Sequence, residues 1–521
     1  MINGQWLMVK SWIKRNKKEV ILLGLILLVG AILRLYKIAD YMTFLGDEGR
    51  DATIVRRLLV NFDPILIGPG TSIGNMYLGP LYYYLIAPAL LIARFSPVGP
   101  SVLVALIGVL TIILLWIMTR EWFPSASSGR VSWAALIAAG LYAVSPTIVI
   151  FSQSSWNPNI MPFFALLSIY SIWKVWKHNA WKWLIVLGIS YAFVLQSHYL
   201  GILLAPTLII FWLLTLFRLR VTRYALNRFL WYSSLGLVAF LVLMSPLVAF
   251  DARHEWRNFS AMRDFIIQKD VSSLASPQKA IGGFPLKVET AIVRLVGARS
   301  EFAGEAVSLL GLLILLSLFV NRKQLDKTRV QGFIILTVWL GVGLLGLSFY
   351  RYEIYDHYYG FFFPAPFALT GGLLGYLIEK TQSSGKILTA LFVGLLLFAS
   401  ISNSHLWNLP QKQMARSIEV ARKIRQEAEG QRFNLAVLAE RNYEDGYKYF
   451  LEVWGEKVIH LDPLRFEDSV TEQLFVVCEK PKDKCDPTHS PKAEVANFGW
   501  SKIDSQWEIG GVVLYKLVHS R

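Results

Sequence analysis

Three carboxylates and an arginine lie within five residues near the start of the chain, in the stretch Asp47-Glu48-Gly49-Arg50-Asp51. This stretch follows directly on the first long apolar run, where a charged side chain is costly unless it has a partner or a function. Asp47 and Asp51 are four residues apart, so on a helix they share one side, and their like charges repel unless a cation or a proton neutralises one. A carboxylate in such a setting is suited to act as a general base.

The same carboxylates also fit structural and metal-binding roles. Gly46 precedes a helical pattern, so Asp47 could cap a helix while Glu48 and Asp51 favour its first turn. A divalent metal bridging Asp47 and Glu48 is a third use for the pair, although the sequence lacks a clear octahedral set of ligands. All three readings stay open at the level of sequence.

Arginines accompany the carboxylates. Arg50, Arg56 and Arg57 offer guanidinium groups that match the geometry of a phosphate. Arg34 lies inside the first apolar run, about one helical turn from its end, where it either extends to the lipid headgroups or binds a lipid phosphate. Carboxylates beside such arginines at a membrane surface predict chemistry on a lipid phosphate.

Further polar and aromatic residues end other apolar runs: Trp156 and Asn157, His198 and Tyr199, and Arg351, Tyr355 and His357. An indole ring next to an amide is suited to holding a sugar. Aromatic belts at membrane surfaces explain tyrosines without any function, and a single histidine is more often structural. Several such clusters at one membrane depth nevertheless predict a shared cavity that binds substrate.

The elements that must position these residues are membrane helices. The chain of 521 residues is 54% hydrophobic and only 17% charged. Its apolar residues form about twelve runs, most of them long enough to cross a bilayer. The net charge of +16 sits mostly in short basic loops beside these runs, which is typical of topology signals rather than of nucleic-acid binding. We predict a polytopic α-helical membrane protein with no nucleic-acid partner.

Basic residues also predict the orientation. The lysines before the first run place residues 1–19 in the cytoplasm. If every apolar run crossed, three basic loops would lie outside, against this rule: those at 174–182, 218–228 and 322–329. Residues 77–94 contain two prolines and three consecutive tyrosines, so we expect an external re-entrant or interfacial helix there and about eleven spans in total. An ordinary span with an unusual topology is the alternative.

With that topology, residues 20–403 form a transmembrane domain whose external segments include a first loop at 39–100 and a long loop at 251–305. Residues 404–521 alternate polar helices with short β-rich runs, which predicts a small α/β domain outside the cytoplasm. The β-rich runs are at 434–438, 458–461, 474–478 and 511–517, and the helices are at 411–429 and 445–454. The two cysteines, Cys478 and Cys485, could form a disulfide there or stay free.

The ordered set of motifs resembles the membrane-embedded glycosyltransferases of the GT-C superfamily, in the bacterial branch of protein O-mannosyltransferases, aminoarabinose transferases and Rgt-like enzymes. The resemblance covers about residues 20–400 and rests on the following segments: 46–51, 79–83, 145–146 with 152–159, 196–199, and 357–358 before 363–366. It implies a polyprenyl-phosphate sugar donor and an external acceptor. It also implies Asp47 as the base that activates the acceptor, Glu48 as a substrate-binding or structural partner, and arginines that hold the donor phosphate. Family members often carry arginine where this chain has Gln153.

We therefore predict a glycosyltransferase of the plasma membrane that moves a sugar from a polyprenyl-phosphate donor to an extracytoplasmic glycan, lipid or protein. No phosphate-binding loop, serine-hydrolase or zinc-protease motif occurs in its required context. A transporter or flippase for a lipid-linked or anionic substrate is the alternative. Its signature would be internal repeats with paired broken helices, which we do not find in the sequence. A sensor with an external ligand-binding domain is a third class.

Overall fold

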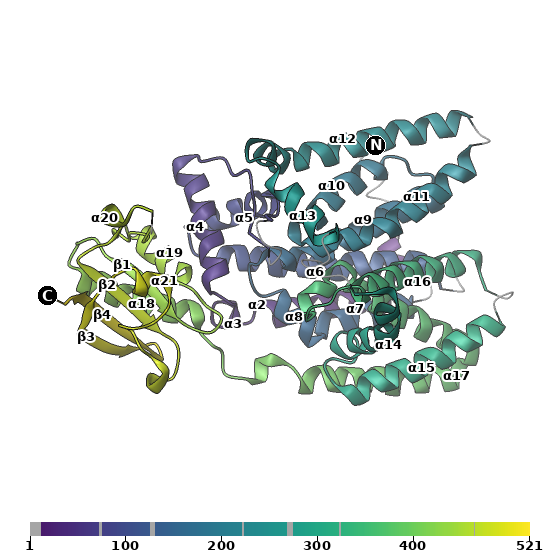
Figure 1. Ribbon diagram of the computed structural model, residues 1–521. Helices are drawn as coiled ribbons and strands as arrows, with labels where there is room; N and C mark the ends of the chain where they lie inside the picture. Colours follow the sequence, from purple (N-terminus) through teal and green to yellow (C-terminus); the bar gives the residue numbers. More distant parts are fainter. Residues whose placement is uncertain are drawn as a thin grey trace.

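The computed structural model describes residues 12–71, 76–125, 131–220, 223–267, 275–321, 325–462 and 464–520. Most of the predicted basic N-terminus, Arg130 and the start of the basic loop at 322–329 lie outside these ranges. Figure 1 shows a bundle of helices with a small sheet domain at one end, beside α3 (Ile38–Tyr41) and α4 (Gly46–Asn61).

The bundle is built from apolar helices of 12 to 39 residues, as their composition predicts. They are α2 (Lys17–Leu35), α6 (Val98–Trp122), α7 (Trp133–Val144), α9 (Met161–His178), α10 (Trp183–Ser197), α11 (Ala205–Leu219), α12 (Arg223–Arg253), α15 (Glu301–Val320), α16 (Lys327–Ser348) and α17 (Pro364–Ser402). Within the described ranges, six helices are long and apolar enough to cross a membrane, or seven if one bent pair is a single span. The chain is therefore a polytopic helical membrane protein.

Shorter helices connect these elements. They are α5 (Leu81–Ile92), α8 (Pro146–Phe151), α13 (Arg257–Ile267), α14 (Pro277–Arg294) and the 3-10 helices η1 (Asn157–Ile160), η2 (Tyr199–Leu204), η4 (Asp356–Phe362) and η5 (His405–Trp407). The segment 251–305, predicted as a long loop, thus contains the two helices α13 and α14. Its amphipathic sequence packs partly against α15 and α16 instead of remaining irregular.

Charged helix ends gather at the end of the bundle away from the sheet domain, which we call the basic end. Ion pairs join neighbouring helices there: Glu19 with Arg120 at 3.0 Å, Lys174 with Glu121 at 3.0 Å, and Arg329 with Glu379 at 2.9 Å. Pairing lowers the cost of charge near lipid. The opposite end, next to the sheet domain, is called the site end.

Helix α5 has both of its ends near the site end. The amide of Leu81 donates to Oε1 of Gln196 at 3.2 Å, and the carbonyl of Phe95, just past α5, accepts from the hydroxyl of Tyr449 in the sheet domain at 2.6 Å. Because both ends of α5 lie near the site end, this helix of 12 residues does not connect the two ends of the bundle. This placement agrees with the expectation of an interfacial or re-entrant helix.

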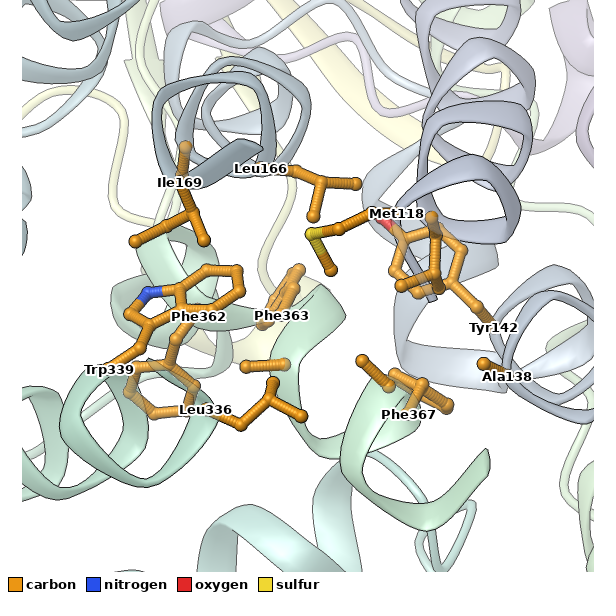
Figure 2. Packing of buried hydrophobic residues seen from close by; sticks show 14 of the residues in the cluster. Met118, Ala138, Tyr142, Leu166, Ile169, Leu336, Trp339, Phe362, Phe363 and Phe367 are labelled. Atoms are coloured by element: carbon orange, nitrogen blue, oxygen red, sulfur yellow. The ribbon is translucent and has the colours of Figure 1, made fainter. Parts of the chain in front are cut away.

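Aromatic side chains fill the centre of the bundle. Figure 2 shows Trp339, Phe362, Phe363 and Phe367 packed with Met118, Leu166 and Tyr142. The indole of Trp339 is fully buried and donates to the carbonyl of Phe361 at 3.1 Å, so its one polar atom is satisfied. Because lipid is as apolar as these side chains, close packing holds such helices together.

The sheet domain is an α/β unit, as predicted. Its elements are α18 (Gln413–Ala428), β1 (Asn434–Leu438), α19 (Asp445–Val453), α20 (Phe466–Ser469), β2 (Gln473–Cys478), η6 (Lys482–Lys484), α21 (Ala493–Ala496), β3 (Ser501–Ile509) and β4 (Val512–His519). The strand order is β1-β2-β4-β3, with β1 and β2 parallel and the other neighbours antiparallel. Cys478 and Cys485 form a disulfide just after β2.

One strand prediction in this domain was wrong, and one strand was not predicted. Residues 458–461 make only a single bridge, between Phe433 and Val458, because their main-chain groups do not continue along the edge of β1. Strand β3 was missed, since it is an edge strand whose mostly exposed residues, such as Lys502 and Asp504, give no apolar alternation.

A glycine contact sets the closeness of α10 and α12. A Cβ on Gly188 would overlap the carbonyl of Gly236, and a Cβ on Gly236 would overlap the carbonyl of Leu184. We expect Gly188→Ala to destabilise the protein by about 1–3 kcal/mol, because the two backbones must separate. Thermal unfolding in detergent measures this loss. Gly24→Ala is the matched control, since no atom lies within 4 Å of its Cβ; equal midpoints for both variants would contradict the prediction.

Candidate functional site

Helix α4 presents the carboxylate cluster at the site end. The side chain of Glu48 turns back, and its Oε2 accepts from the amide of Leu45 at 2.9 Å. This bond satisfies a free amide at the helix start, so Glu48 performs the capping role considered for Asp47. No hydrogen bond from a backbone amide to the Asp47 side chain occurs among the described residues, and Asp47 is therefore free for another function.

Arg50 joins the two aspartates of the cluster. It donates to Oδ1 of Asp47 at 2.9 Å and to Oδ1 of Asp51 at 2.8 Å. Tyr83 of α5 also donates to Oδ1 of Asp51, at 3.0 Å. Asp51 is buried, whereas the side chain of Asp47 is 42% exposed. Asp51 and Tyr83 therefore fix the guanidinium, and the guanidinium in turn holds Asp47 at the surface of the cluster.

The buried carboxyl groups titrate near neutrality. Burial raises the pKa of Asp51 to about 6, against the opposing effect of Arg50. Burial also raises the pKa of Glu48 to about 7, the nearby charges of Asp47 and Asp51 add to this rise, and hydrogen bonds from the backbone oppose it. For Arg50, burial lowers the pKa, but the negative charges around it dominate and keep its pKa above the usual value.

Asp47 and Arg50 line a cavity of about 240 Å³. The other side chains around it include Trp156, Asn157, His198, Tyr199, His357 and Tyr358. The structure therefore brings together half of the predicted site residues, from α4, the polar turn after α8, the start of η2 and η4. A cavity with one carboxylate, one guanidinium and two imidazoles can hold an anion beside a base.

The two histidines are packed against aromatic rings. The ring centroids of His357 and Trp156 are 4.6 Å apart, and those of His198 and His357 are 5.6 Å apart. Nδ1 of His198 accepts from the amide of Leu200 at 3.2 Å, which assigns the proton of the neutral ring to Nε2. Nε2 of His198 is thus a hydrogen-bond donor suited to a phosphate oxygen.

The polar turn at residues 152–159 positions the surrounding elements. Ser154 accepts from the amide of Thr43 at 2.8 Å, and Ser155 shares a hydrogen bond of 2.7 Å with Tyr82. Asn157, predicted to hold a sugar through its amide, donates that amide to the carbonyl of Ser197 at 2.7 Å. These bonds tie the turn to the segment before α4, to α5 and to α10.

Gln153 is also engaged within the protein. Its amide nitrogen donates to the carbonyl of Leu33 at 2.9 Å, and its oxygen lies 2.6 Å from Nε2 of His405. At 1% exposure, this side chain links α2 to η5. The arginine function that the resemblance assigns to this position is therefore not replaced by Gln153.

Three arginines predicted to bind phosphate do not line the cavity. Arg34 is fully buried in the bundle and donates to the carbonyls of Gly30 and Ala143, so it does not extend to lipid headgroups. Arg57 pairs with Glu452 of the sheet domain at 3.0 Å, and Arg56 lies 6.0 Å from the ring centroid of Phe95. Arg56 and Arg57 are close to Asp47 in the sequence, but this closeness does not determine which face of α4 each of them occupies.

Two other predicted site residues lie at the rim. Arg351 and Tyr355 are exposed and do not line the cavity, although the Tyr355 ring stacks on His357 with centroids 6.0 Å apart. Their neighbour Asp356 binds Arg299 at 2.7 Å and Arg294 at 3.4 Å. Sequence analysis missed these two arginines, because they lie in the segment predicted as a loop.

Sequence analysis also missed Tyr443 of the sheet domain. Its hydroxyl donates to Oδ1 of Asp47, and Arg50 donates to that hydroxyl at 3.2 Å. Tyr443 is 396 residues away from Asp47 in the chain, and no spacing rule links them. An external placement of both segments was the only signal that could have suggested the contact.

The carboxylate pair is poorly arranged for a shared metal ion. Asp47 lines the cavity described above, whereas Glu48 lines a separate small cavity with Asp51 and Ser155. Among the described residues, no group of three or more His, Cys, Asp or Glu side chains could hold a metal ion. The donor set at Asp47 and Glu48 therefore does not fit a bridging cation.

The raised pKa of Glu48 makes stability depend on pH. A carboxyl whose folded-state pKa lies above its ordinary value of 4.5 stabilises the fold below that pH, and the contribution is lost as pH rises through about 7. We expect Glu48→Gln to reduce the fall in thermal midpoint between about pH 5 and about pH 8. Glutamine keeps an acceptor for the amide of Leu45 and does not ionise.

Thermal unfolding in detergent at the two pH values checks this prediction. The matched control is Glu472→Gln, since Glu472 is an exposed carboxylate in the sheet domain. Midpoints of the Glu48→Gln variant that fall with pH as steeply as those of the wild type would contradict it.

Comparisons with known proteins agree with this architecture. Residues 78–250 match the family model of dolichyl-phosphate-mannose-protein mannosyltransferase. The crystal structure of ArnT from Cupriavidus metallidurans bound to undecaprenyl phosphate superposes with a TM-score of 0.62 at 14% identity, covering 95% of this chain and 97% of ArnT. The apo state of the same protein gives 0.57 at 13% identity, covering 98% of each chain. No curated protein was found to match.

A second kind of enzyme shares the fold. The archaeal oligosaccharyltransferase AglB from Archaeoglobus fulgidus, in complex with an inhibitory peptide and a dolichol-phosphate, superposes with a TM-score of 0.52 at 13% identity. This alignment covers 89% of the chain and 70% of AglB. At these identities the structural likeness establishes the fold alone. The family match covers residues 78–250, which include α5 and extend into α12. The chain therefore shares the fold of these membrane glycosyltransferases, and its residues 78–250 are similar to the dolichyl-phosphate-mannose-protein mannosyltransferase family.

Proposed function

We propose that the protein transfers a sugar from a polyprenyl-phosphate donor to an acceptor outside the cytoplasm, with Asp47 as the general base. The observation that carries this proposal is the cavity in which Asp47 lies beside Arg50, His198 and His357. A base next to anion-binding groups is what the transfer of a sugar from a lipid phosphate requires. The complexes of ArnT with undecaprenyl phosphate and of AglB with a dolichol-phosphate support a donor of this class.

The reaction follows from these groups. The acceptor hydroxyl or amine gives its proton to Asp47 while its lone pair forms a bond to the anomeric carbon of the sugar. The bond between that carbon and the phosphate oxygen breaks, and the electron pair leaves with the polyprenyl phosphate. The activated donor supplies the driving force, so no ATP is needed. A single displacement of this kind would invert the anomeric carbon.

Arg50 and His198 are suited to stabilise the leaving phosphate. Asp51 and Tyr83 fix the guanidinium of Arg50 before substrate binds, and such preorganised charge costs no rearrangement during the reaction. Nε2 of His198, which also lines the cavity, adds a neutral donor. Trp156, in contact with His357, offers an aromatic face for the sugar ring.

The orientation proposed is a cytoplasmic basic end and an extracytoplasmic site end in the plasma membrane. The ion-paired helix ends carry the lysines and arginines that the positive-inside rule assigns to the cytoplasm. The disulfide between Cys478 and Cys485 supports the same orientation, because disulfides persist outside the reducing cytoplasm. The sheet domain would then face the acceptor.

Replacement of the base tests the reaction. We expect Asp47→Asn to lower transfer from radiolabelled polyprenyl-phosphate sugars by about 10²–10⁴-fold, because asparagine cannot accept the proton. Lipid copurified with the variant, measured by mass spectrometry, should stay at the wild-type level. Asp40→Asn is the matched control, since Asp40 is nearby but does not line the cavity.

Full activity of Asp47→Asn would remove Asp47 from catalysis. If the wild type transferred sugar from no donor but moved a lipid-linked substrate across vesicles, the transporter or flippase class would replace the enzyme.

Cysteine labelling tests the orientation. Lys182 lies between α9 and α10 at the basic end, and Lys502 lies on β3; both side chains are exposed. We expect a membrane-impermeant maleimide to label Lys502→Cys in intact cells, and Lys182→Cys only after permeabilisation. The native cysteines are disulfide-bonded and should not react. Labelling of Lys182→Cys in intact cells would overturn the orientation.

A further inference from the structure

The sheet domain packs directly on the segment that carries the catalytic cluster (Figure 1). Phe44 packs edge-on against Tyr449 and in a tilted arrangement against Phe450 of α19, with ring centroids 6.2 Å and 5.5 Å apart. One continuous buried cluster contains Phe44, Ala52 and the core of the sheet domain. The amide of Phe44 also donates to Oε1 of Gln413 at 2.9 Å. The two parts therefore share a hydrophobic core.

The loop after β1 makes the closest approach to the cluster. Oδ1 of Asn442 accepts from the amide of Gly46 at 2.9 Å, which satisfies a free amide at the start of α4. The next residue, Tyr443, donates its hydroxyl to Oδ1 of Asp47. Burial and the charge of Asp47 raise the pKa of Tyr443, so its hydroxyl stays protonated and acts as a donor.

Two glycines of α4 make this approach sterically feasible. A Cβ on Gly46 would lie 2.5 Å from the ring of Tyr443, and a Cβ on Gly49 would overlap the carbonyl of Asp445. Neither glycine has a positive φ, so the helix itself does not demand them. The glycines that flank Asp47 and Glu48 in the sequence are explained by the docking of the sheet-domain loop.

The two carboxylate oxygens of Asp47 differ in their hydrogen bonds. Oδ1 accepts from both Arg50 and Tyr443, whereas Oδ2 accepts from no group among the described residues. Two charge-assisted bonds to one oxygen fix the rotation of a carboxylate. Oδ2 is then available to take the proton of the acceptor substrate, because the Asp47 side chain lines the cavity.

We propose that Tyr443 is a positioning residue for the base, so that the sheet domain completes the catalytic site through its contact with Asp47. This inference rests on the proposed function of Asp47. It gives the C-terminal domain a role in the chemical step, in addition to any role in acceptor recognition.

Removal of one hydroxyl tests the inference. In Tyr443→Phe the ring stays over Gly46 but the bond to Asp47 is lost. We expect kcat to fall about 10–100-fold with donor KM within about twofold, because the carboxylate is less well oriented.

The matched control is Tyr449→Phe, which removes another hydroxyl from the same interface. Tyr449 donates to the carbonyl of Phe95 at 2.6 Å and makes no hydrogen bond with Asp47. We expect its kcat and donor KM to match those of the wild type. Gly46→Ala provides a second variant, because its new methyl group displaces the Tyr443 ring and should reproduce the kcat loss.

The outcomes separate this inference from the proposed function. Wild-type kcat in Tyr443→Phe, together with loss of transfer in Asp47→Asn, would overturn the positioning role alone. Equal kcat losses in Tyr443→Phe and Tyr449→Phe would also overturn it, because they would indicate a general effect of domain docking. Full transfer by Asp47→Asn would overturn the proposed base itself.

Discussion

Charge beside a membrane must be neutralised, and the structure near Asp47 is organised by this requirement. A single charged side chain within a membrane helix costs about 2.5–3.5 kcal/mol, so several charges close together persist only with partners. Arg50 binds both Asp47 and Asp51, and Tyr83 donates a second hydrogen bond to Oδ1 of Asp51. Because these bonds come from α4 and α5, the two helices and the bundle beneath them take a fixed relation to each other.

The same requirement explains why the sheet domain is docked. Asp47 is the least buried member of the cluster and receives its last hydrogen bond from Tyr443. Arg57, on a more exposed face of α4, pairs with Glu452 of the same domain. Charged residues of α4 thus pair with groups of the sheet domain. The hydrophobic contact around Phe44 stabilises this docking. The helical bundle supplies a scaffold, while the domain that follows it supplies a hydrogen bond to Asp47 at the cavity.

Much of this could be predicted from the sequence. Apolar runs and basic loops predicted the helical bundle, and strands β1, β2 and β4 followed from short apolar runs. The clusters around Asp47, Trp156, His198 and His357 were correctly expected to meet, because residues that end apolar runs on one side share a depth. Strand β3 was not predicted, since its polar edge has no apolar pattern.

The sequence by itself determined the membrane class, the residue types at the site and the likeness to GT-C enzymes, because these depend on local composition and spacing. Only the tertiary structure decided which arginines face the cavity, that Glu48 caps α4 while Asp47 does not, and that Tyr443 reaches Asp47. Those facts depend on helix rotation and on contacts between segments almost 400 residues apart. Local physical preferences act over a few residues and carry no information about such distant partners.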